Sequence, residues 1–285
     1  MIQEDCVTCN QPGKLLVGVT LDRHVFGKLD DNDMTVYSSG FYEMYCDESY
    51  SSAREIVPFL VERFKPESVV DVGCGLGTWL SAFREQGVGT ILGIDGDYVP
   101  RDKLFIGPDL FLPHDLGTSL QVPRRFDLAI SMEVAEHIPA RRADTFISSL
   151  ASLADVILFS AAVPHQGGAG HVNEQWPEYW IQKFADLGFV PYESVRKAFW
   201  ENPRVAYYYS QNSFLFVHHS RQSKYGCLEQ EKRAEPPYAR IHPRRWLEAN
   251  DPKQQVLRPL LRAFPYAAAK AATRRLRRFA GRVME

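Results

Sequence analysis

The sequence lacks several features that would assign it to a special class of protein. None of its 285 residues belongs to a run approaching the roughly 20 apolar residues that span a membrane. Its first residues show no basic stretch followed by an apolar one, as a secretory signal would. Charged residues make up 24% of the chain and the net charge is only −2, which is ordinary for a globular protein. We therefore expect a cytoplasmic globular protein.

Cysteines are few and do not pair by position. The five cysteines lie at positions 6, 9, 46, 74 and 227. An odd, scattered set disfavours a disulfide framework. Cys6 and Cys9 have half of a zinc-site spacing, but no second pair of this kind follows. We interpret this pair as incidental, and a metal site completed by a histidine such as His24 is the alternative.

The basic residues are concentrated at one end of the chain. Residues 256–285 contain eight basic residues and one acidic residue, with apolar positions at helical spacing. Such a basic helix could bind an anionic membrane surface or an acidic partner, or pack on the body or on a second subunit. The remainder of the chain is net acidic, which argues against a nucleic-acid-binding surface.

The most informative stretch is VVDVGCGLGTW at residues 69–79. A β-branched run ends at Asp71, a loop with Gly73, Gly75 and Gly77 follows, and a helical segment then begins. Glycines permit positive φ and let the backbone approach a ligand closely. The start of the following helix offers unsatisfied N–H groups. This pattern predicts a strand, a ligand-binding turn and a helix.

A second predicted strand at residues 90–95 ends in Asp95, an acid placed to bind ribose hydroxyls. The loop spacing is G-x-G-x-G, whereas dinucleotide sites usually have G-x-G-x-x-G. An acid such as Asp71 would repel a pyrophosphate but suits a ligand with an amino group and a cationic centre. The stretch resembles the first motif of the class I, Rossmann-like S-adenosylmethionine-dependent methyltransferases, and the resemblance covers about residues 50–220.

Three further segments fall in register with this motif, at residues 93–96, 114–116 and 126–139. The resemblance implies that Asp95 and Gly96 bind the ribose and that Asp115, with Leu116, binds the adenine. It places Glu133 beside the methionine part of the cofactor. Together with the three glycines and Asp71, these residues form the predicted cofactor site.

The alternation of strands and helices predicts an α/β fold with an open, doubly wound sheet. The family resemblance implies that this sheet is seven-stranded and mostly parallel, with helices on both faces. Strands are expected near residues 69–72, 91–95, 104–106 or 110–112, 127–131, 156–161, 192–198 and 213–218. Helices are expected at residues 53–64 (capped by Ser51 or Ser52), 79–85, 140–153 and 173–187, the last broken or started at Pro177. The family resemblance implies that the last strand is antiparallel.

Three regions divide the chain. Residues 1–50 form an N-terminal extension whose aromatic end could cap the cofactor mouth or pack on the sheet. Residues 51–220 form the methyltransferase domain, and residues 221–285 form a C-terminal extension with the basic helical tail.

The acceptor site is expected after the fifth strand, where residues 164–180 read PHQGGAGHVNEQWPEYW. This glycine-rich loop gathers polar side chains beside tryptophans, as carbohydrate sites often do. Glu174, Gln175 and Trp176 are the predicted acceptor-binding residues, although a tryptophan here could equally belong to the core. The segment looks similar to a subgroup of these methyltransferases in polysaccharide and glycolipid pathways.

A hydroxyl acceptor must lose its proton, so a general base within hydrogen-bond reach is useful. His171 and His165 are the first candidates, and His137, after the fourth strand, is the rival placement. Each could instead be a solvated or packing histidine. Histidine with carboxylate also permits a divalent metal that polarises a hydroxyl, but no spacing requires one.

The sequence therefore predicts an S-adenosylmethionine-dependent methyltransferase that acts on a hydroxyl of a sugar or another small polar metabolite. N- or carboxyl methylation of a small molecule is an alternative, as is a cofactor-binding partner protein without transferase activity. The acids Asp71, Asp95 and Asp115 argue against an inactive cofactor site. An N-P-P-Y-type motif is absent after the fourth strand, which disfavours nucleic-acid methylation. A homo-oligomer is compatible with the sequence.

Overall fold

The computed structural model describes residues 39–229 and 233–250. The Cys6–Cys9 pair and the basic tail at residues 256–285 lie outside these residues. Their predicted roles therefore stay predictions.

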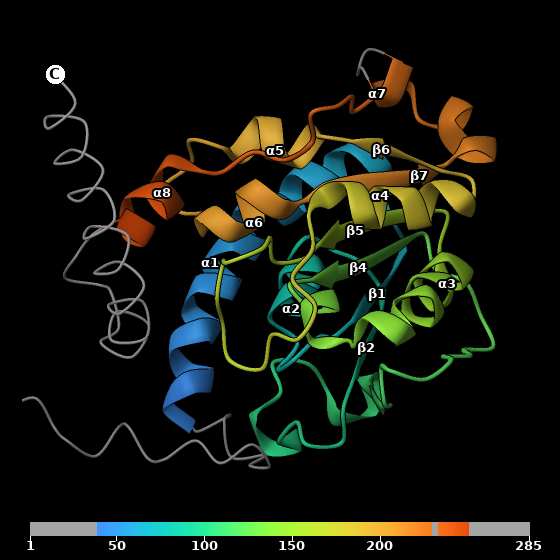
Figure 1. The fold of residues 1–285 in the computed structure, drawn as a ribbon. Coiled ribbons are helices and arrows are strands. Elements are labelled where there is room, and N and C mark those ends of the chain that lie inside the picture. Colours follow the sequence, from blue (N-terminus) through green and yellow to red (C-terminus); the bar gives the residue numbers. More distant parts are fainter. Residues whose placement is uncertain (1–38, 230–232, 251–285) are drawn as a thin grey trace, which may run out of the picture. The chain divides into compact units, whose positions relative to one another are not determined.

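The described residues contain a seven-stranded sheet with the order β3-β2-β1-β4-β5-β7-β6 (Figure 1). The strands are β1 (Ser68–Val72), β2 (Thr90–Asp95), β3 (Phe111–Pro113), β4 (Leu128–Met132), β5 (Val156–Ser160), β6 (Phe189–Tyr192) and β7 (Phe214–His218). Strand β7 pairs antiparallel with both β5 and β6, and the other pairings are parallel. The predicted fold class and the antiparallel last strand are confirmed.

Helices cover both faces of the sheet. The α-helices are α1 (Ser39–Phe64), α2 (Thr78–Glu85), α3 (Ala143–Leu153), α4 (Pro177–Asp186), α5 (Ser194–Phe199), α6 (Tyr207–Asn212), α7 (Gly226–Glu229) and α8 (Pro243–Asn250). The 3-10 helices are η2 (Arg101–Lys103), η3 (Pro108–Leu110), η4 (Ala135–His137), η5 (Ala140–Arg142) and η6 (His219–Lys224). Successive strand residues point to opposite faces, so Val69 packs with α1, α2 and α5, whereas Val70 packs with α3 and α4.

Two local predictions are wrong. The first helix begins at Ser39, so Ser52 lies inside it and donates its hydroxyl to the Glu48 carbonyl at 2.7 Å, instead of capping a helix start. Residues 194–199, expected in a strand, form helix α5, and strand β6 ends before them at Tyr192. In the second segment Val195 and Phe199 are buried in the core, and tertiary packing overrode their local preference.

The strand order reverses between β1 and β4, which lie side by side at the centre of the sheet. In open α/β sheets, ligands bind beyond the carboxyl ends of the strands at this point. Three connections leave the same edge there: the glycine loop after β1, η4 after β4 and residues 161–176 after β5.

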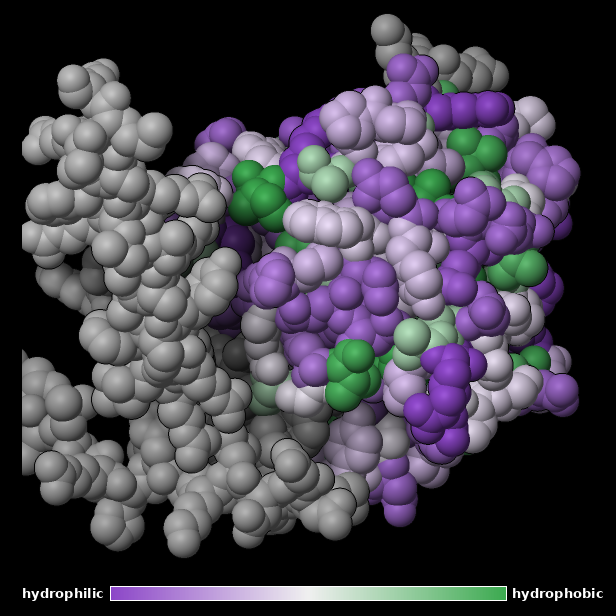
Figure 2. Space-filling model, viewed as in Figure 1, coloured by the Kyte–Doolittle hydropathy of each residue, from purple (hydrophilic) through white to green (hydrophobic). Residues whose placement is uncertain are grey.

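The face seen in Figure 2 is largely hydrophilic, with its apolar residues in small scattered groups. This agrees with the burial of most large apolar side chains in two clusters, one on each side of the sheet. No helix among the described residues is long and apolar enough to cross a membrane.

Candidate active site

The glycine loop is held tightly against the end of β2. Gly73, Gly75 and Gly77 have φ values of 88°, 51° and 81°. The Gly73 N–H donates to the carbonyl of Ile94 at 2.7 Å. A Cβ atom at Gly73 would lie 2.3 Å from Cγ2 of Val134. Both the positive φ and the close approach require glycine at position 73.

Asp95 anchors this loop from the end of β2. Its Oδ2 accepts the Gly75 N–H at 2.7 Å, and its Oδ1 accepts the Gly96 N–H and the Tyr98 hydroxyl, both at 2.6 Å. Burial raises the pKa of Asp95, although these hydrogen bonds counteract it. The acid predicted to bind the ribose is thus fixed by the glycine loop itself.

Asp71 is a buried acid without a partner. Only 2% of its surface is exposed, and its carboxylate makes no hydrogen bond to the described residues. Burial, followed by the nearby charge of Asp95, raises its pKa well above the usual range. A buried carboxylate is stable in its charged form only beside a compensating charge. The position therefore suits a cationic ligand group.

Asp115 follows β3 and is the most exposed of the predicted cofactor acids. Its Oδ1 accepts the Gly117 N–H at 2.9 Å, and its Oδ2 lies 3.5 Å from Nη1 of Arg142. Leu116 is half-buried beside it and packs against one of the two core clusters. This pair combines a hydrogen-bond acceptor with an apolar surface.

Glu133 directly follows β4 and has a φ of 56°, which is unusual for a residue other than glycine. Its backbone N–H donates to the Ser160 hydroxyl at 3.0 Å and to the Ser160 carbonyl at 3.1 Å. Its carboxylate accepts from Gln166 at 2.8 Å and from Asn212 at 3.0 Å. Burial raises the pKa of Glu133 to about 7, despite these bonds. Glu133 thereby joins β4, the loop after β5 and helix α6.

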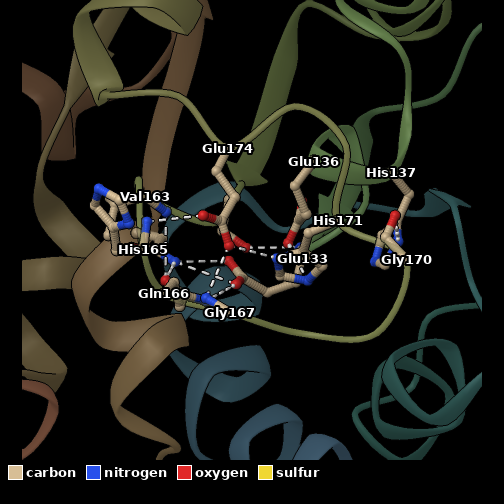
Figure 3. A network of polar contacts seen from close by, with 12 residues as sticks. Glu133, Glu136, His137, Val163, His165, Gln166, Gly167, Gly170, His171 and Glu174 are labelled. Carbon is tan, nitrogen blue, oxygen red and sulfur yellow. Dashed lines mark hydrogen bonds and ion pairs between the residues drawn. The ribbon is translucent and has the colours of Figure 1, made fainter. Parts of the chain in front are cut away.

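Glu174 organises the loop at residues 161–176. Its carboxylate accepts the backbone N–H groups of His165 at 2.7 Å and Gly167 at 2.8 Å, and it lies 2.9 Å from Nδ1 of His171 (Figure 3). Partial burial opposes ionisation of Glu174, but these three donors outweigh it and lower its pKa. Because Glu174 is ionised, Nδ1 of His171 carries a proton and donates it in this contact.

The loop then turns back to the end of β4. The backbone N–H groups of Val172 and Asn173 both donate to the carbonyl of Glu136 at 2.9 Å. This return places the ring of His171 against the ring of His137, with centroids 4.9 Å apart and planes at 90°. The two histidines, predicted as rival positions, thus belong to one cluster.

The tautomer of His137 follows from its partner. Its Nδ1 lies 3.2 Å from the carbonyl oxygen of Gly170, which can only accept, so Nδ1 carries the proton. Burial, with the nearby His171, lowers the pKa of His137 to about 4. His137 is therefore neutral at physiological pH and presents a free Nε2 lone pair.

Glu136 completes the cluster as a fully buried acid, 0% exposed. Neither of its carboxylate oxygens has a hydrogen-bond partner among the described residues. The closest basic group is Nε2 of His171, 4.0 Å from Oε1. Burial, followed by the charge of Glu133, raises its pKa well above the usual range.

The other predicted acceptor-site residues lie on the same loop but outside this cluster. The side chain of His165 is exposed and makes no hydrogen bond among the described residues. Gln175 donates to Oδ1 of Asn173 at 2.9 Å. Trp176 is 43% exposed just before α4, whereas Trp180 is 2% exposed and packs in the core.

Four residues of the site escaped the sequence-based prediction: Gln166, Glu136, Tyr209 and Asn212. Glu136 lies inside the segment at residues 126–139, in which the resemblance assigned a cofactor role to Glu133 alone. The ring of Tyr209 contacts Trp79 at 5.3 Å between centroids, at the start of the helix that follows the glycine loop. Nothing in the local sequence of helix α6 indicates that Tyr209 and Asn212 reach the site.

Residues 47–202 match the profile of a family described as a methyltransferase domain. The chain belongs to this family. It is a methyltransferase whose cofactor is S-adenosylmethionine. The positive φ of the three loop glycines and the buried Asp71, which has no hydrogen-bond partner among the described residues, fit a closely bound ligand with a cationic group. No curated protein sequence matches the chain.

Solved structures with a similar fold share little sequence with this methyltransferase. The sugar N-methyltransferase KedS8 from Streptoalloteichus is 15% identical, with a TM-score of 0.48, over 67% of this chain and 99% of KedS8. The Synechocystis magnesium protoporphyrin IX methyltransferase is 20% identical, with a TM-score of 0.42, over 60% and 80% of the two chains. DesVI from Streptomyces venezuelae is 19% identical, with a TM-score of 0.39, over 45% of this chain and only 58% of DesVI.

Proposed function

We propose that this methyltransferase methylates a hydroxyl group of a sugar or another small polar acceptor, bound where β4 and β5 end. The observation that carries this proposal is the pair of packed imidazoles, His137 and His171, beside the buried acid Glu136. The hydrogen bonds of both rings use Nδ1, so Nε2 of each ring is the atom that would accept a proton or polarise an O–H bond.

The cofactor would occupy the edge formed by the ends of β1, β2 and β3. Asp95 and Gly96 would bind the ribose, and Asp115 with Leu116 would bind the adenine. Asp71 would face the amino group of the methionine part, because a cation there compensates a buried carboxylate that has no other partner. S-adenosylmethionine supplies a methyl group already activated by a sulfonium.

The glycine loop and Glu133 would complete this cofactor-binding site. Gly73, Gly75 and Gly77 give the backbone the close approach that the cofactor needs. Glu133 lies at the junction of the two halves of the site, since it contacts Gln166 of the acceptor loop and Asn212 of α6.

The protein would mainly align the acceptor with the methyl group and ease the loss of the hydroxyl proton. Nε2 of His171, held in place through Glu174, and Nε2 of His137 are the groups available for that proton. A neutral amine acceptor already has a lone pair for attack and needs no such help. A cluster that offers two groups for this proton therefore favours a hydroxyl as the acceptor of the methyl group.

Acceptor recognition would come from the rest of the loop. The exposed face of Trp176 and the polar head of Gln175 offer an aromatic surface beside a hydrogen-bonding group. Glu174 also belongs to the loop, but its oxygens already accept three hydrogen bonds. We assign it the orientation of His171 as its main role. His165 stays a second candidate base, with its ring outside the cluster.

The test is methyl transfer from labelled cofactor to matched acceptor pairs that differ only in a hydroxyl or an amine, such as sugars with their amino-sugar analogues and phenols with anilines. The proposal expects label on the hydroxyl oxygen. Label on nitrogen or on a carboxylate alone would replace it with N- or carboxyl methylation. Tight cofactor binding without transfer to any acceptor class would favour a partner protein without this activity.

A further inference from the structure

The cluster at the end of β4 contains a buried acid whose charge nothing in the described residues compensates. Glu136 is fully buried, and neither carboxylate oxygen has a hydrogen-bond partner. Two more acids lie close by, as Figure 3 shows. Glu133 is three residues earlier in the chain, and Glu174 contacts His171, the histidine nearest to Glu136. None of these three carboxylates forms an ion pair with a lysine or arginine among the described residues. The cluster is thus rich in acids and lacks a cation.

Both histidines lie within reach of this acid: Nε2 of His171 is 4.0 Å from its Oε1, and His137 offers a ring nitrogen to the same group of ligand atoms. Each uses its Nδ1–H for a structural hydrogen bond, His137 to the Gly170 carbonyl and His171 to the Glu174 carboxylate. These bonds leave Nε2 of each ring as the nitrogen that can bind an ion. A carboxylate or a backbone carbonyl behind the imidazole is the arrangement that fixes metal-binding histidines in the tautomer they need.

The distances also suit one ion. One ligand atom from each of Glu136, His137 and His171 can be chosen so that all three lie within 4.8 Å of one another. Ligands of one ion stand at about 2.0–2.2 Å from it and about 3–3.5 Å from each other. The three side chains would need to close by roughly 1 Å, which a small change of side-chain torsions provides.

We propose that Glu136, His137 and His171 bind a divalent transition-metal ion. Two nitrogen ligands and one oxygen ligand favour zinc, manganese or cobalt, whereas magnesium and calcium prefer an all-oxygen set. Three protein ligands leave further coordination positions open, as in catalytic metal sites.

An open position gives the ion a role that rests on the proposed function. A hydroxyl oxygen of the acceptor would occupy it, and the ion would lower the pKa of that hydroxyl. The hydroxyl proton would then pass to bulk water, because the Nε2 lone pairs of both histidines would be bound to the ion. The ion would also compensate the buried charge of Glu136.

The experiment measures metal binding directly, without methyl transfer. The full-length protein, with Cys6→Ser and Cys9→Ser to remove competing thiolates, is stripped with a chelator. It is then titrated calorimetrically with zinc, manganese and magnesium chlorides. We expect one zinc or manganese ion per chain and much weaker magnesium binding. His171→Ala and Glu136→Gln should each weaken zinc binding by at least about tenfold.

His219→Ala is the matched control, because it removes a histidine outside the cluster, whose Nδ1 lies 3.0 Å from the Gly188 carbonyl. It should leave zinc binding unchanged, and circular dichroism would verify that all the variants are folded. Absence of zinc and manganese binding in the folded parent would overturn the site. Binding that survives both His171→Ala and Glu136→Gln would overturn it as well.

The metal site and the proposed function can fail separately. Metal binding that both variants abolish, in a protein that methylates only amines, supports the site and rejects the hydroxyl acceptor. Hydroxyl methylation that continues at full rate in chelator-treated protein, together with no metal binding, overturns the site and leaves the proposed function standing.

Discussion

Nε2 of His171 lies 4.0 Å from Oε1 of the buried Glu136, although the two residues come from different connections of the sheet. The contact exists because the loop after β5 returns to the end of β4 and donates two backbone N–H groups to the carbonyl of Glu136. The proposed acceptor site therefore lies at the same edge of the sheet as the proposed cofactor-binding site.

The proposed cofactor-binding site predicts that Asp95→Ala specifically weakens the affinity for S-adenosylmethionine. This change removes the proposed ribose acceptor and also the anchor of the Gly75 N–H. Hydrogen bonds to a charged group contribute about 1.5–3 kcal/mol, so affinity for S-adenosylmethionine should fall at least about tenfold. Isothermal titration calorimetry measures it. Asp97→Ala is the control, because that side chain is 91% exposed and pairs only with Arg101. Equal affinities in the two variants would refute the assignment.

The raised pKa of Asp71 predicts opposite effects of pH on stability and on cofactor binding. Without cofactor, the folded state holds the Asp71 proton more tightly than the unfolded chain does. Stability is therefore lost as pH rises from the usual aspartate range through the raised pKa. Cofactor affinity should increase over the same window, because the ionised acid attracts the amino group.

Asp71→Asn tests this relationship. Denaturant unfolding at a series of pH values should show a smaller loss of stability with rising pH in the variant than in the parent. Its cofactor affinity should be weak and should depend less on pH. If parent and variant have identical pH profiles for both stability and affinity, Asp71 does not have this role.

The geometry of the glycine loop predicts that an alanine is tolerated less well at position 73 than at position 89. Gly73→Ala places a Cβ atom 2.3 Å from Cγ2 of Val134 on a backbone with positive φ. We expect a stability loss of about 1–3 kcal/mol and a weaker cofactor complex. Gly89→Ala should change stability by less, because nothing lies within 4 Å of the added Cβ. Thermal and denaturant unfolding measure both, and a Gly73→Ala protein as stable as Gly89→Ala would contradict the structure.

The sequence predicted the features that are encoded locally. Three of them depend only on neighbouring residues: the glycine loop after Asp71, the acid at the end of β2 and the helix start at Pro177. Such local patterns can be recognised in the sequence before the fold is known. The doubly wound α/β fold followed from the alternation of strands and helices, and the seven strands from the family resemblance.

Other features depend on packing between distant segments. Helix α5 at residues 194–199 contains Val195 and Phe199, which suit a strand equally well, and only burial in the core selects the helix. The approach of His171 to His137 depends on two backbone hydrogen bonds to Glu136, which no pattern in the sequence reveals. Asn212 reaches Glu133 from a helix that was not predicted.

The central claim is that the cluster of Glu136, His137 and His171 activates a hydroxyl acceptor beside the cofactor. The most direct measurement is the single-turnover rate of methyl transfer in His171→Ala and His165→Ala, with cofactor affinity determined in parallel. The account predicts a rate about 10²–10⁴-fold lower in His171→Ala, with unchanged cofactor affinity, and a near-normal rate in His165→Ala. A normal rate in His171→Ala, or a loss confined to His165→Ala, would contradict it.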